Sequence, residues 1–283
     1  MELHQDPLSQ RERTARFRAL HHAGDTLVLP NAWDGISAKI FEVAGFGAVA
    51  TTSSGVSFAQ GVPDGEHLDP DRLLQVVGVM TSLIAVPLTV DIEAGYADGD
   101  TARFRAFVAR LLDAGAVGIN LEDGSAATGR LRDLAEQQQL IRQARAVAGE
   151  KGFDIFINAR TDAMHYAEGE TPERVRVAVK RAAAFQEAGA DGIFVPFVTD
   201  LETVAALKAA ITLPLNILVN EHLEIAALRR LGVNRVSTGS RPVLATLGLL
   251  TRIADQLKTS DDWSLLYTGG VTYPQANAWL KRG

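Results

Sequence analysis

Apolar and polar positions alternate along the chain in a cycle that repeats from about residue 26 to residue 257. Each cycle contains a short apolar run, typical of a buried strand, and then a longer segment whose apolar residues recur at helical spacing. The eight apolar runs are residues 26–30, 47–52, 86–90, 116–121, 153–159, 191–196, 213–219 and 233–237. The predicted helices are residues 34–44, 69–84, 100–114, 132–149, 172–188, 200–210, 222–231 and 241–257, after a lead-in helix at 9–23.

A glycine recurs where a predicted helix ends and the next strand begins. An alanine–glycine pair closes the helix at Gly45, Gly115 and Gly189, and Gly232 belongs to a weaker copy. Glycine fits the left-handed position that ends many helices. Eight strand–helix units predict an α/β protein with a (β/α)8 barrel of the TIM type over residues 1–257. An open doubly wound sheet is the alternative, but the Gly-x-Gly-x-x-Gly turn that normally follows its first strand is absent.

Residues 258–283 lie beyond the eighth unit and are rich in aromatic side chains. Trp263, Tyr267, Tyr273 and Trp279 lie in this extension, which is not needed to close the barrel. We expect it to pack on a neighbouring subunit. The alternative is that it folds back on its own barrel.

Composition narrows the class of protein. The chain has 283 residues with 47% hydrophobic residues, enough for one large domain, and a formal net charge of −6, which argues against a nucleic-acid partner. The absence of cysteine excludes disulfides, thiolate metal sites and a cysteine nucleophile or acid. The first twenty residues lack the apolar run of a signal peptide, and no apolar stretch approaches the roughly 20 residues that span a bilayer. We therefore expect a cytoplasmic protein with no membrane partner.

Several predicted strands end in charged residues, and the carboxyl ends of barrel strands meet at one face. Asp91 and Glu93 follow the third strand, and an extended backbone would point both side chains to the same side. Glu122 ends the fourth strand and Arg160 the fifth. Neighbouring carboxylates repel unless a cation lies between them, so this pattern predicts a Mg²⁺ site. The alternative is an ion network at the barrel rim with no further function.

A substrate can be placed beside this cluster. Mg²⁺ keeps few protein ligands, which leaves room for a chelating 2-oxo acid, and Arg160 can make a two-pronged contact with a carboxylate or an enolate oxygen. Backbone amides around Ser54 can receive the other end of the substrate. The candidate substrate-binding residues are Trp33, Ser54, Gly55, Val56, Asp91, Arg160 and Asn216.

The motifs resemble those of the isocitrate lyase and phosphoenolpyruvate mutase superfamily. The resemblance covers about residues 27–250, and its motifs are segments 29–34, 51–57, 90–96, 121–123 and 158–163. It implies an eightfold barrel whose eighth helix is exchanged between subunits, in a homodimer or homotetramer. It also implies Mg²⁺ or Mn²⁺ near Asp91, Glu93 and Glu122, partly through water.

The resemblance also implies roles for individual residues. Ser54, Gly55 and Val56 would hold the substrate carboxylate, and Arg160 the oxygen that becomes negative. Asp64 resembles the acid of the family's mobile loop after the second strand. The candidate catalytic residues are Arg160, Asp64, Glu122 and Arg130.

The loop after the fourth strand departs from the family pattern. The family's lyases carry a lysine–cysteine motif there, in which the cysteine gives a proton to the departing enolate, and the enzymes that act on P–C bonds use a lysine. Residues 124–131 contain neither. Arg130 can supply positive charge but is a poor proton donor, because an arginine pKa lies above about 12.

These observations favour a Mg²⁺-dependent lyase-class enzyme. It would cleave a C–C bond in a small 2-oxo or 2-hydroxy di- or tricarboxylate, similar to isocitrate, methylisocitrate or oxaloacetate, through a metal-stabilised enolate. One alternative is a mutase or hydrolase for a P–C bond of the phosphonopyruvate type. Another is a non-catalytic protein that binds 2-oxo acids.

Overall fold

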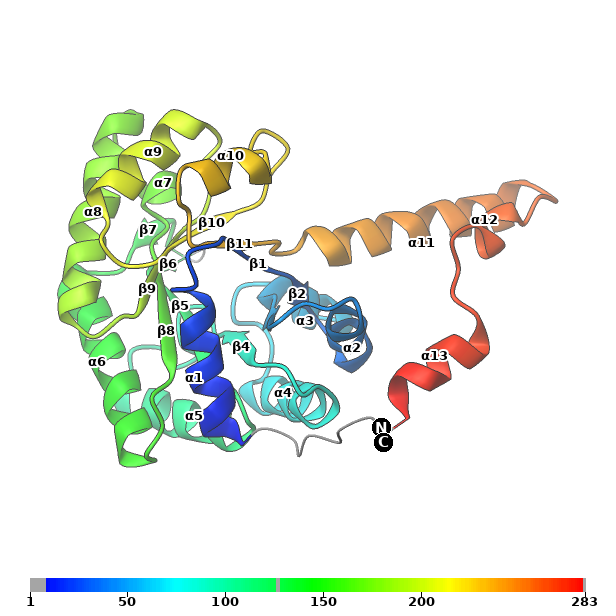
Figure 1. The fold of residues 1–283 in the computed structure, drawn as a ribbon, viewed down its shortest axis with the longest axis horizontal. Helices are drawn as coiled ribbons and strands as arrows, with labels where there is room; N and C mark the ends of the chain where they lie inside the picture. Colours follow the sequence, from blue (N-terminus) through cyan, green and yellow to red (C-terminus); the bar gives the residue numbers. More distant parts are fainter. Residues whose placement is uncertain (1–8, 126–127, 282–283) are drawn as a thin grey trace.

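The structure, a computed structural model, describes residues 9–125 and 128–281, and its centre is a ring of parallel strands surrounded by helices (Figure 1). The ring contains β1 (Leu27–Leu29), β2 (Asn31–Ala32), β3 (Val49–Thr51), β4 (Leu88–Asp91), β5 (Gly118–Glu122), β8 (Phe156–Arg160), β9 (Gly192–Val195), β10 (Leu215–Leu218) and β11 (Arg235–Ser237). The helices that alternate with these strands are α2 (Gly35–Val43), α4 (Pro70–Leu83), α5 (Thr101–Asp113), α6 (Leu134–Glu150), α8 (Thr171–Glu187), α9 (Leu201–Ala210), α10 (Ile225–Arg230) and α11 (Arg241–Thr259).

The ring closes at the first predicted strand, residues 26–30, which contains β1, while β2 follows directly after Pro30. β1 pairs in parallel with β11, and β2 pairs in parallel with β3, so one short segment joins both edges of the sheet. Proline has no N–H to donate, but the Pro30 carbonyl accepts the Ala50 N–H at 2.9 Å. The eight predicted strands and the (β/α)8 barrel are confirmed.

Capping side chains, prolines and glycines in the local sequence explain where the helices begin and end. The Asp69 side chain accepts a first-turn N–H at 2.7 Å, and Pro70 is the first residue of α4. Gly45, Gly115 and Gly189 follow α2, α5 and α8 with φ of +92°, +96° and +101°. These values lie in the left-handed region that glycine tolerates, so the predicted helix stops are confirmed.

The lead-in helix α1 (Gln10–Leu20) closes the amino-terminal end of the barrel. Ser9 and Glu12 form a capping box at its start. Phe17 is fully buried and packs edge-on against Phe156, the first residue of β8, with ring centroids 5.5 Å apart. The pocket lies at the opposite end of the barrel, at the carboxyl ends of the strands.

Six elements were not predicted. The helix α3 (Ser53–Ala59) follows β3, α7 (Ala163–Tyr166) follows β8, and a hairpin of β6 (Gly124–Ser125) and β7 (Arg130–Leu131) follows β5. The other two, α12 (Ser264–Tyr267) and α13 (Tyr273–Leu280), lie in the carboxyl-terminal extension. None of the helices in the described ranges is long and apolar enough to cross a membrane.

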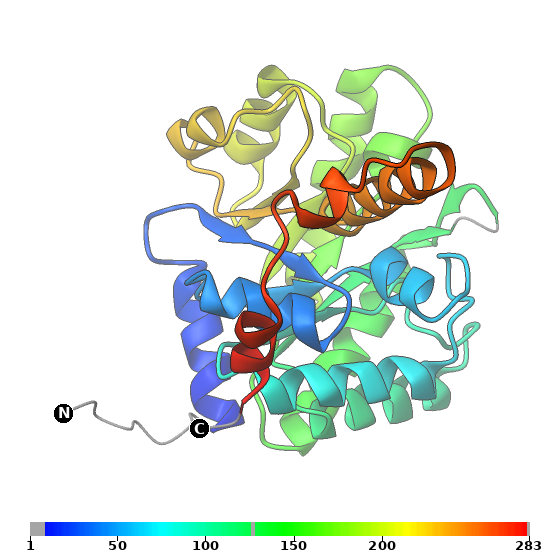
Figure 2. The same cartoon turned by 90° about the vertical axis from the view of Figure 1, so that its right-hand side faces the viewer.

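Helix α11 projects away from the barrel, and Figure 2 views the molecule from that side. Val243 is its one buried residue. Its exposed leucines are Leu244, Leu247, Leu249, Leu250 and Leu257. The chain then returns, and α13 lies against α2 of the same barrel. The predicted boundary at residue 257 falls inside the last turn of α11.

Candidate active site

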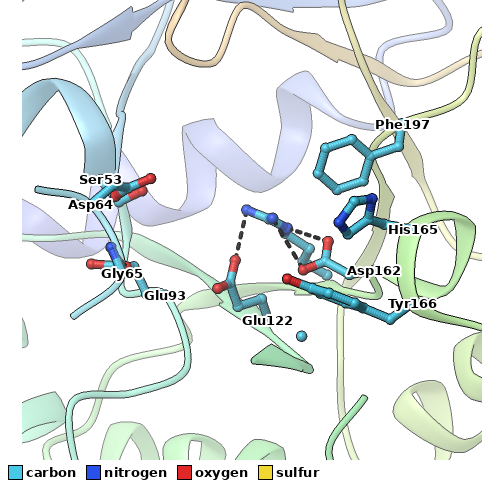
Figure 3. A pocket seen from close by; sticks show the side chains of 11 residues that line it. Ser53, Asp64, Gly65, Glu93, Glu122, Asp162, His165, Tyr166 and Phe197 are labelled. Atoms are coloured by element: carbon cyan, nitrogen blue, oxygen red, sulfur yellow. Dashed lines mark hydrogen bonds and ion pairs between the residues drawn. The ribbon is translucent and has the colours of Figure 1, made fainter. Parts of the chain in front are cut away.

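Arg160 lines a pocket at the carboxyl ends of the strands, and Figure 3 shows nine of the other residues that line this pocket. Arg160 is the last residue of β8, and its register partner on β5 is Glu122. Its Nη1 lies 2.7 Å from Glu122 Oε2, while Nε and Nη2 contact the two Asp162 oxygens at 2.8 and 3.1 Å. Burial lowers the Arg160 pKa, but Glu122 and Asp162 outweigh it and raise that pKa above its usual value. The two hydrogen bonds to Asp162 use Nε and Nη2, and the guanidinium lines the pocket.

Asp162 is itself held in place from below. Its backbone N–H donates to Asp123 Oδ1 at 2.8 Å, and Asp123 Oδ2 accepts from Arg181 Nε of α8 at 2.5 Å. Asp123 is fully buried. We call Arg160, Asp162, Asp123 and Arg181 the arginine network, because it fixes the orientation of Arg160 through successive charged contacts.

Glu93 holds the opposite side of the pocket. Its Oε2 accepts the N–H groups of Gly65 and Glu66 at 3.0 and 2.8 Å, and its Oε1 accepts from the Tyr96 hydroxyl. We call these contacts the loop clamp, because they attach the loop that carries Asp64 to the end of β4. The expected pleat geometry was wrong here: β4 ends at Asp91, and Glu93 has a φ of +48°.

The carboxyl groups of this region have shifted pKa values. Burial raises the pKa of Asp91, although Arg160 opposes that effect. Burial, assisted by Asp91 and Asp64, raises the pKa of Glu93 to about 7 against the Tyr96 hydrogen bond. Burial also raises the pKa of Glu122, with Arg160 again opposing. Crowded acids of this kind would be relieved by a cation.

The donor set suits a hard cation bound partly through water. No three His, Cys, Asp or Glu side chains within residues 9–125 and 128–281 form a ready cluster around one metal position. Asp91, Glu93 and Glu122 nevertheless end adjacent strands or follow them directly, and all three offer oxygen ligands. Mg²⁺ prefers oxygen and usually retains several waters, so this looser arrangement fits it.

The pocket has two adjoining parts. The outer part is about 240 Å³ and includes Glu93 and Glu122, and the inner part is about 260 Å³ and includes Asp91 and Ser54. Both parts share Ser53, Asp64, Arg160 and Phe197. These volumes suit a small acid.

The predicted residues Trp33, Gly55 and Val56 line neither part of the pocket. Gly55 has no room for a side chain, since a Cβ there would lie 2.6 Å from Thr52 and 2.8 Å from Trp33. The Val56 side chain is buried, and its N–H donates to the Thr52 carbonyl at 3.0 Å inside the turn that begins α3. Ser54 is therefore the residue of this group that reaches the pocket.

Two further predicted residues are not brought to the pocket. Asn216 is buried below its floor, where Oδ1 accepts from Ser237 at 3.1 Å. Arg130 is exposed on β7 and lines neither part of the pocket.

Other pocket residues were missed by the sequence reasoning. His165 and Tyr166 come from α7, and Phe197 follows the end of β9. Their one signal was position, because each comes shortly after a strand's carboxyl end. Large apolar and aromatic side chains there resemble core residues, so the signal was weak.

Comparison with known proteins identifies the family. Residues 17–258 match the family described as phosphoenolpyruvate phosphomutase. The Mycobacterium tuberculosis protein Rv1998c, whose function is uncharacterised, is 39% identical over 232 residues, which are 82% of this chain and 84% of that protein. The phosphoenolpyruvate phosphomutase of Streptomyces hygroscopicus is 33% identical over 192 residues, 65% of this chain and 59% of that protein. Relatives with 29% and 30% identity are the 2-methylisocitrate lyase of Bacillus subtilis and the oxaloacetate decarboxylase of Paraburkholderia xenovorans.

Solved structures agree with this family. A Burkholderia cenocepacia protein described as a phosphonomutase superposes with a TM-score of 0.83 and 37% identity, covering 88% of this chain and 99% of its own. A phosphonopyruvate hydrolase crystallised with oxalate and Mg²⁺ has a TM-score of 0.81 and 23% identity over 94% of each chain, which shows the shared fold. The chain belongs to the phosphoenolpyruvate phosphomutase family, within the isocitrate lyase and phosphoenolpyruvate mutase superfamily of lyases and mutases.

Proposed function

We propose that this protein is a divalent-metal-dependent lyase that cleaves a C–C bond in a small 2-oxo or 2-hydroxy di- or tricarboxylate through an enolate. The observation that carries the proposal is Arg160, which Glu122 and Asp162 hold in place while part of its guanidinium faces the pocket. An arginine fixed in this way is suited to a carboxylate or to an oxygen that gains negative charge.

The pocket residues divide the work of binding and proton transfer. Arg160 receives the 2-oxo or enolate oxygen, and the Ser54 hydroxyl with nearby α3 amides receives the substrate carboxylate. Asp64 lines both parts of the pocket, and it would accept a proton from a substrate hydroxyl. Glu122 orients Arg160 and is the second candidate for proton exchange.

Asp91, Glu93 and Glu122 would hold Mg²⁺ or Mn²⁺. When bound, the metal would polarise the oxo group and offset the negative charge of the enolate. The raised pKa values of Asp91 and Glu93 support this assignment, since burial and mutual repulsion disfavour their charge without a cation.

P–C bond chemistry is the second candidate, because relatives include a phosphoenolpyruvate phosphomutase and a phosphonopyruvate hydrolase. A phosphonate carries more negative charge than a carboxylate and needs more cationic partners. Among the described residues that line the pocket, Arg160 is the only Arg or Lys. This charge balance favours the C–C reaction.

The same proposal includes exchange of α11 between two subunits in a homodimer or homotetramer. The support is the row of exposed leucines on a helix that projects from its own barrel (Figure 1). Burying these leucines would remove apolar surface from water at roughly 25 cal/mol per Å². Sedimentation velocity should find a dimer or tetramer, and a stable monomer would contradict the exchange.

The reaction is tested by proton and phosphorus NMR of the purified protein with Mg²⁺. The acids would be isocitrate, 2-methylisocitrate, oxaloacetate and phosphonopyruvate, with Asp91→Ala as the control variant. We expect glyoxylate, pyruvate or acetate (the co-product of oxalate from oxaloacetate) with the unmutated protein alone. Phosphate or phosphoenolpyruvate from phosphonopyruvate would support the P–C reaction instead, and ligand binding without any turnover would support a binding protein.

A further inference from the structure

Phe197 has an unusual backbone for a large side chain. It follows β9 with a φ of +65°, in the left-handed region, and is 46% exposed at the pocket. A bulky residue rarely adopts this conformation because its Cβ crowds the backbone. The fold maintains the conformation, and strain of this kind is concentrated at functional sites.

Phe197 belongs to a group of rings on one side of the pocket. Its centroid lies 5.0 Å from that of His165, and the His165 and Tyr166 centroids are 4.4 Å apart. We call His165, Tyr166 and Phe197 the aromatic wall. Figure 3 shows it across the pocket from Ser53, Asp64 and Glu93.

Arg160 lies close to the aromatic wall and also pairs with Glu122. Its Cζ is 6.0 Å from the Phe197 ring and 5.7 Å from that of Phe194. A carboxylate or oxo group bound to the Arg160 guanidinium would therefore have its carbon chain within reach of Phe197. The aromatic wall disfavours a second anion on the substrate, because ring faces are electron-rich, and it favours an apolar substituent.

We propose that the aromatic wall selects substrates that carry an apolar substituent next to the 2-oxo or 2-hydroxy carbon. The inference rests on the proposed function, because it assumes that Arg160 holds the substrate's polar end. It narrows the substrate class to branched or longer-chain acids rather than unsubstituted ones.

Calorimetric titration with Mg²⁺ and the series pyruvate, 2-oxobutyrate, 2-oxovalerate tests the wall, with oxalate as the reference ligand. We expect affinity to rise about two- to fourfold for each added methylene. Phe197→Ala should remove this increase, so that the affinities of the three acids, each taken relative to oxalate in the same variant, become equal, while Phe197→Tyr should retain it. Phe58→Ala is the matched control, since Phe58 is 40% exposed and lies outside the pocket lining.

The outcomes separate this inference from the proposed function. Oxalate binding with no dependence on chain length, or with the same dependence in Phe197→Ala, overturns the aromatic wall and leaves the proposed function standing. If affinity depends on chain length and Phe197→Ala abolishes that dependence, but no Mg²⁺-dependent oxalate binding is found, the aromatic wall is supported and the proposed metal site is overturned. Absence of all binding overturns both.

Discussion

The arginine network and the loop clamp hold opposite sides of one pocket by different means. The arginine network contains two pairs of oppositely charged side chains, Arg160–Asp162 and Asp123–Arg181, and the Asp162 backbone N–H joins them by donating to Asp123. The loop clamp joins one carboxylate to two backbone N–H groups and a tyrosine hydroxyl. Loss of a member therefore has different consequences: a buried charge without a partner in the first case, and a released loop in the second.

This contrast separates two tasks within the proposed site. A residue that binds a developing negative charge must be fixed before the substrate arrives, since reorientation during the reaction reduces its benefit. Arg160 meets this need through three charged contacts. A loop that admits a substrate needs contacts that can open, and hydrogen bonds from Gly65 and Glu66 suit that need better than buried ion pairs.

The strongest test of the contrast removes the buried end of the arginine network. Asp123→Ala should lower the free energy of unfolding by about 3–5 kcal/mol, because it leaves Arg181 buried without its partner. Urea unfolding measures the change. The matched control is Asp154→Ala: Asp154 pairs with two arginines, at 3.0 and 3.1 Å, but its side chain is 75% exposed. That control should lose less than about 1 kcal/mol, and equal losses would show that Asp123 has no special structural role.

The next test replaces the fork at the centre of the network. Arg160→Lys keeps the charge but loses the paired N–H geometry, so oxalate binding with Mg²⁺ should weaken about 10- to 150-fold, or about 1.5–3 kcal/mol. Calorimetry measures the dissociation constant. Arg176→Lys is the control, since that side chain is 71% exposed on α8. Unchanged oxalate affinity in Arg160→Lys would remove Arg160 from the proposed site.

The sequence alone predicts the barrel and, of the two sides of the pocket compared above, the side that contains Arg160. Strand and helix positions depend on local periodicity and on helix stops such as Gly115, so the pattern alone predicts them. Glu122 and Arg160 follow from the same pattern, because parallel strands place their last residues together.

The positions of the other site residues depend on how deep each side chain lies in the barrel and on contacts with loops that are distant in the chain. Hydrophobic periodicity encodes neither. Asn216 belongs to a predicted strand, but it is the second residue of β10 and lies below the pocket floor. Glu93 leaves the strand geometry because its partners, Gly65 and Glu66, come from a loop about thirty residues earlier in the chain. Phe197 resembles a core residue in the sequence, and only the folded chain places it beside Arg160.

A single added methyl group tests how tightly the arginine network is packed. A Cβ at Gly124 would collide with Asp162 Oδ2 and would lie 2.9 Å from Tyr166 Cε2. Gly124→Ala should therefore cost about 1–3 kcal/mol of stability and weaken oxalate binding, because Asp162 must move. Gly78→Ala on α4 is the control, since nothing lies within 4 Å of its added Cβ. If Gly124→Ala matches that control in thermal unfolding and oxalate titration, Asp162 is not fixed as described.

The smallest effect concerns the loop clamp and its dependence on pH. The Glu93 pKa rises from 4.5 to about 7 on folding, so between these values the folded protein binds more protons than the unfolded chain. Metal-free protein should therefore lose stability as the pH rises through this window, by about 1 kcal/mol between pH 6 and 7. Glu93→Gln should remove this contribution, whereas Glu150→Gln, at an exposed ion pair, should keep it. Urea unfolding at pH 6 and 7 measures the difference, and the same slope in both variants would show that the Glu93 carboxylate gains no proton on folding. Mg²⁺ should reduce the slope in unmutated protein, because a bound cation favours the charged carboxylate that repulsion and burial disfavour.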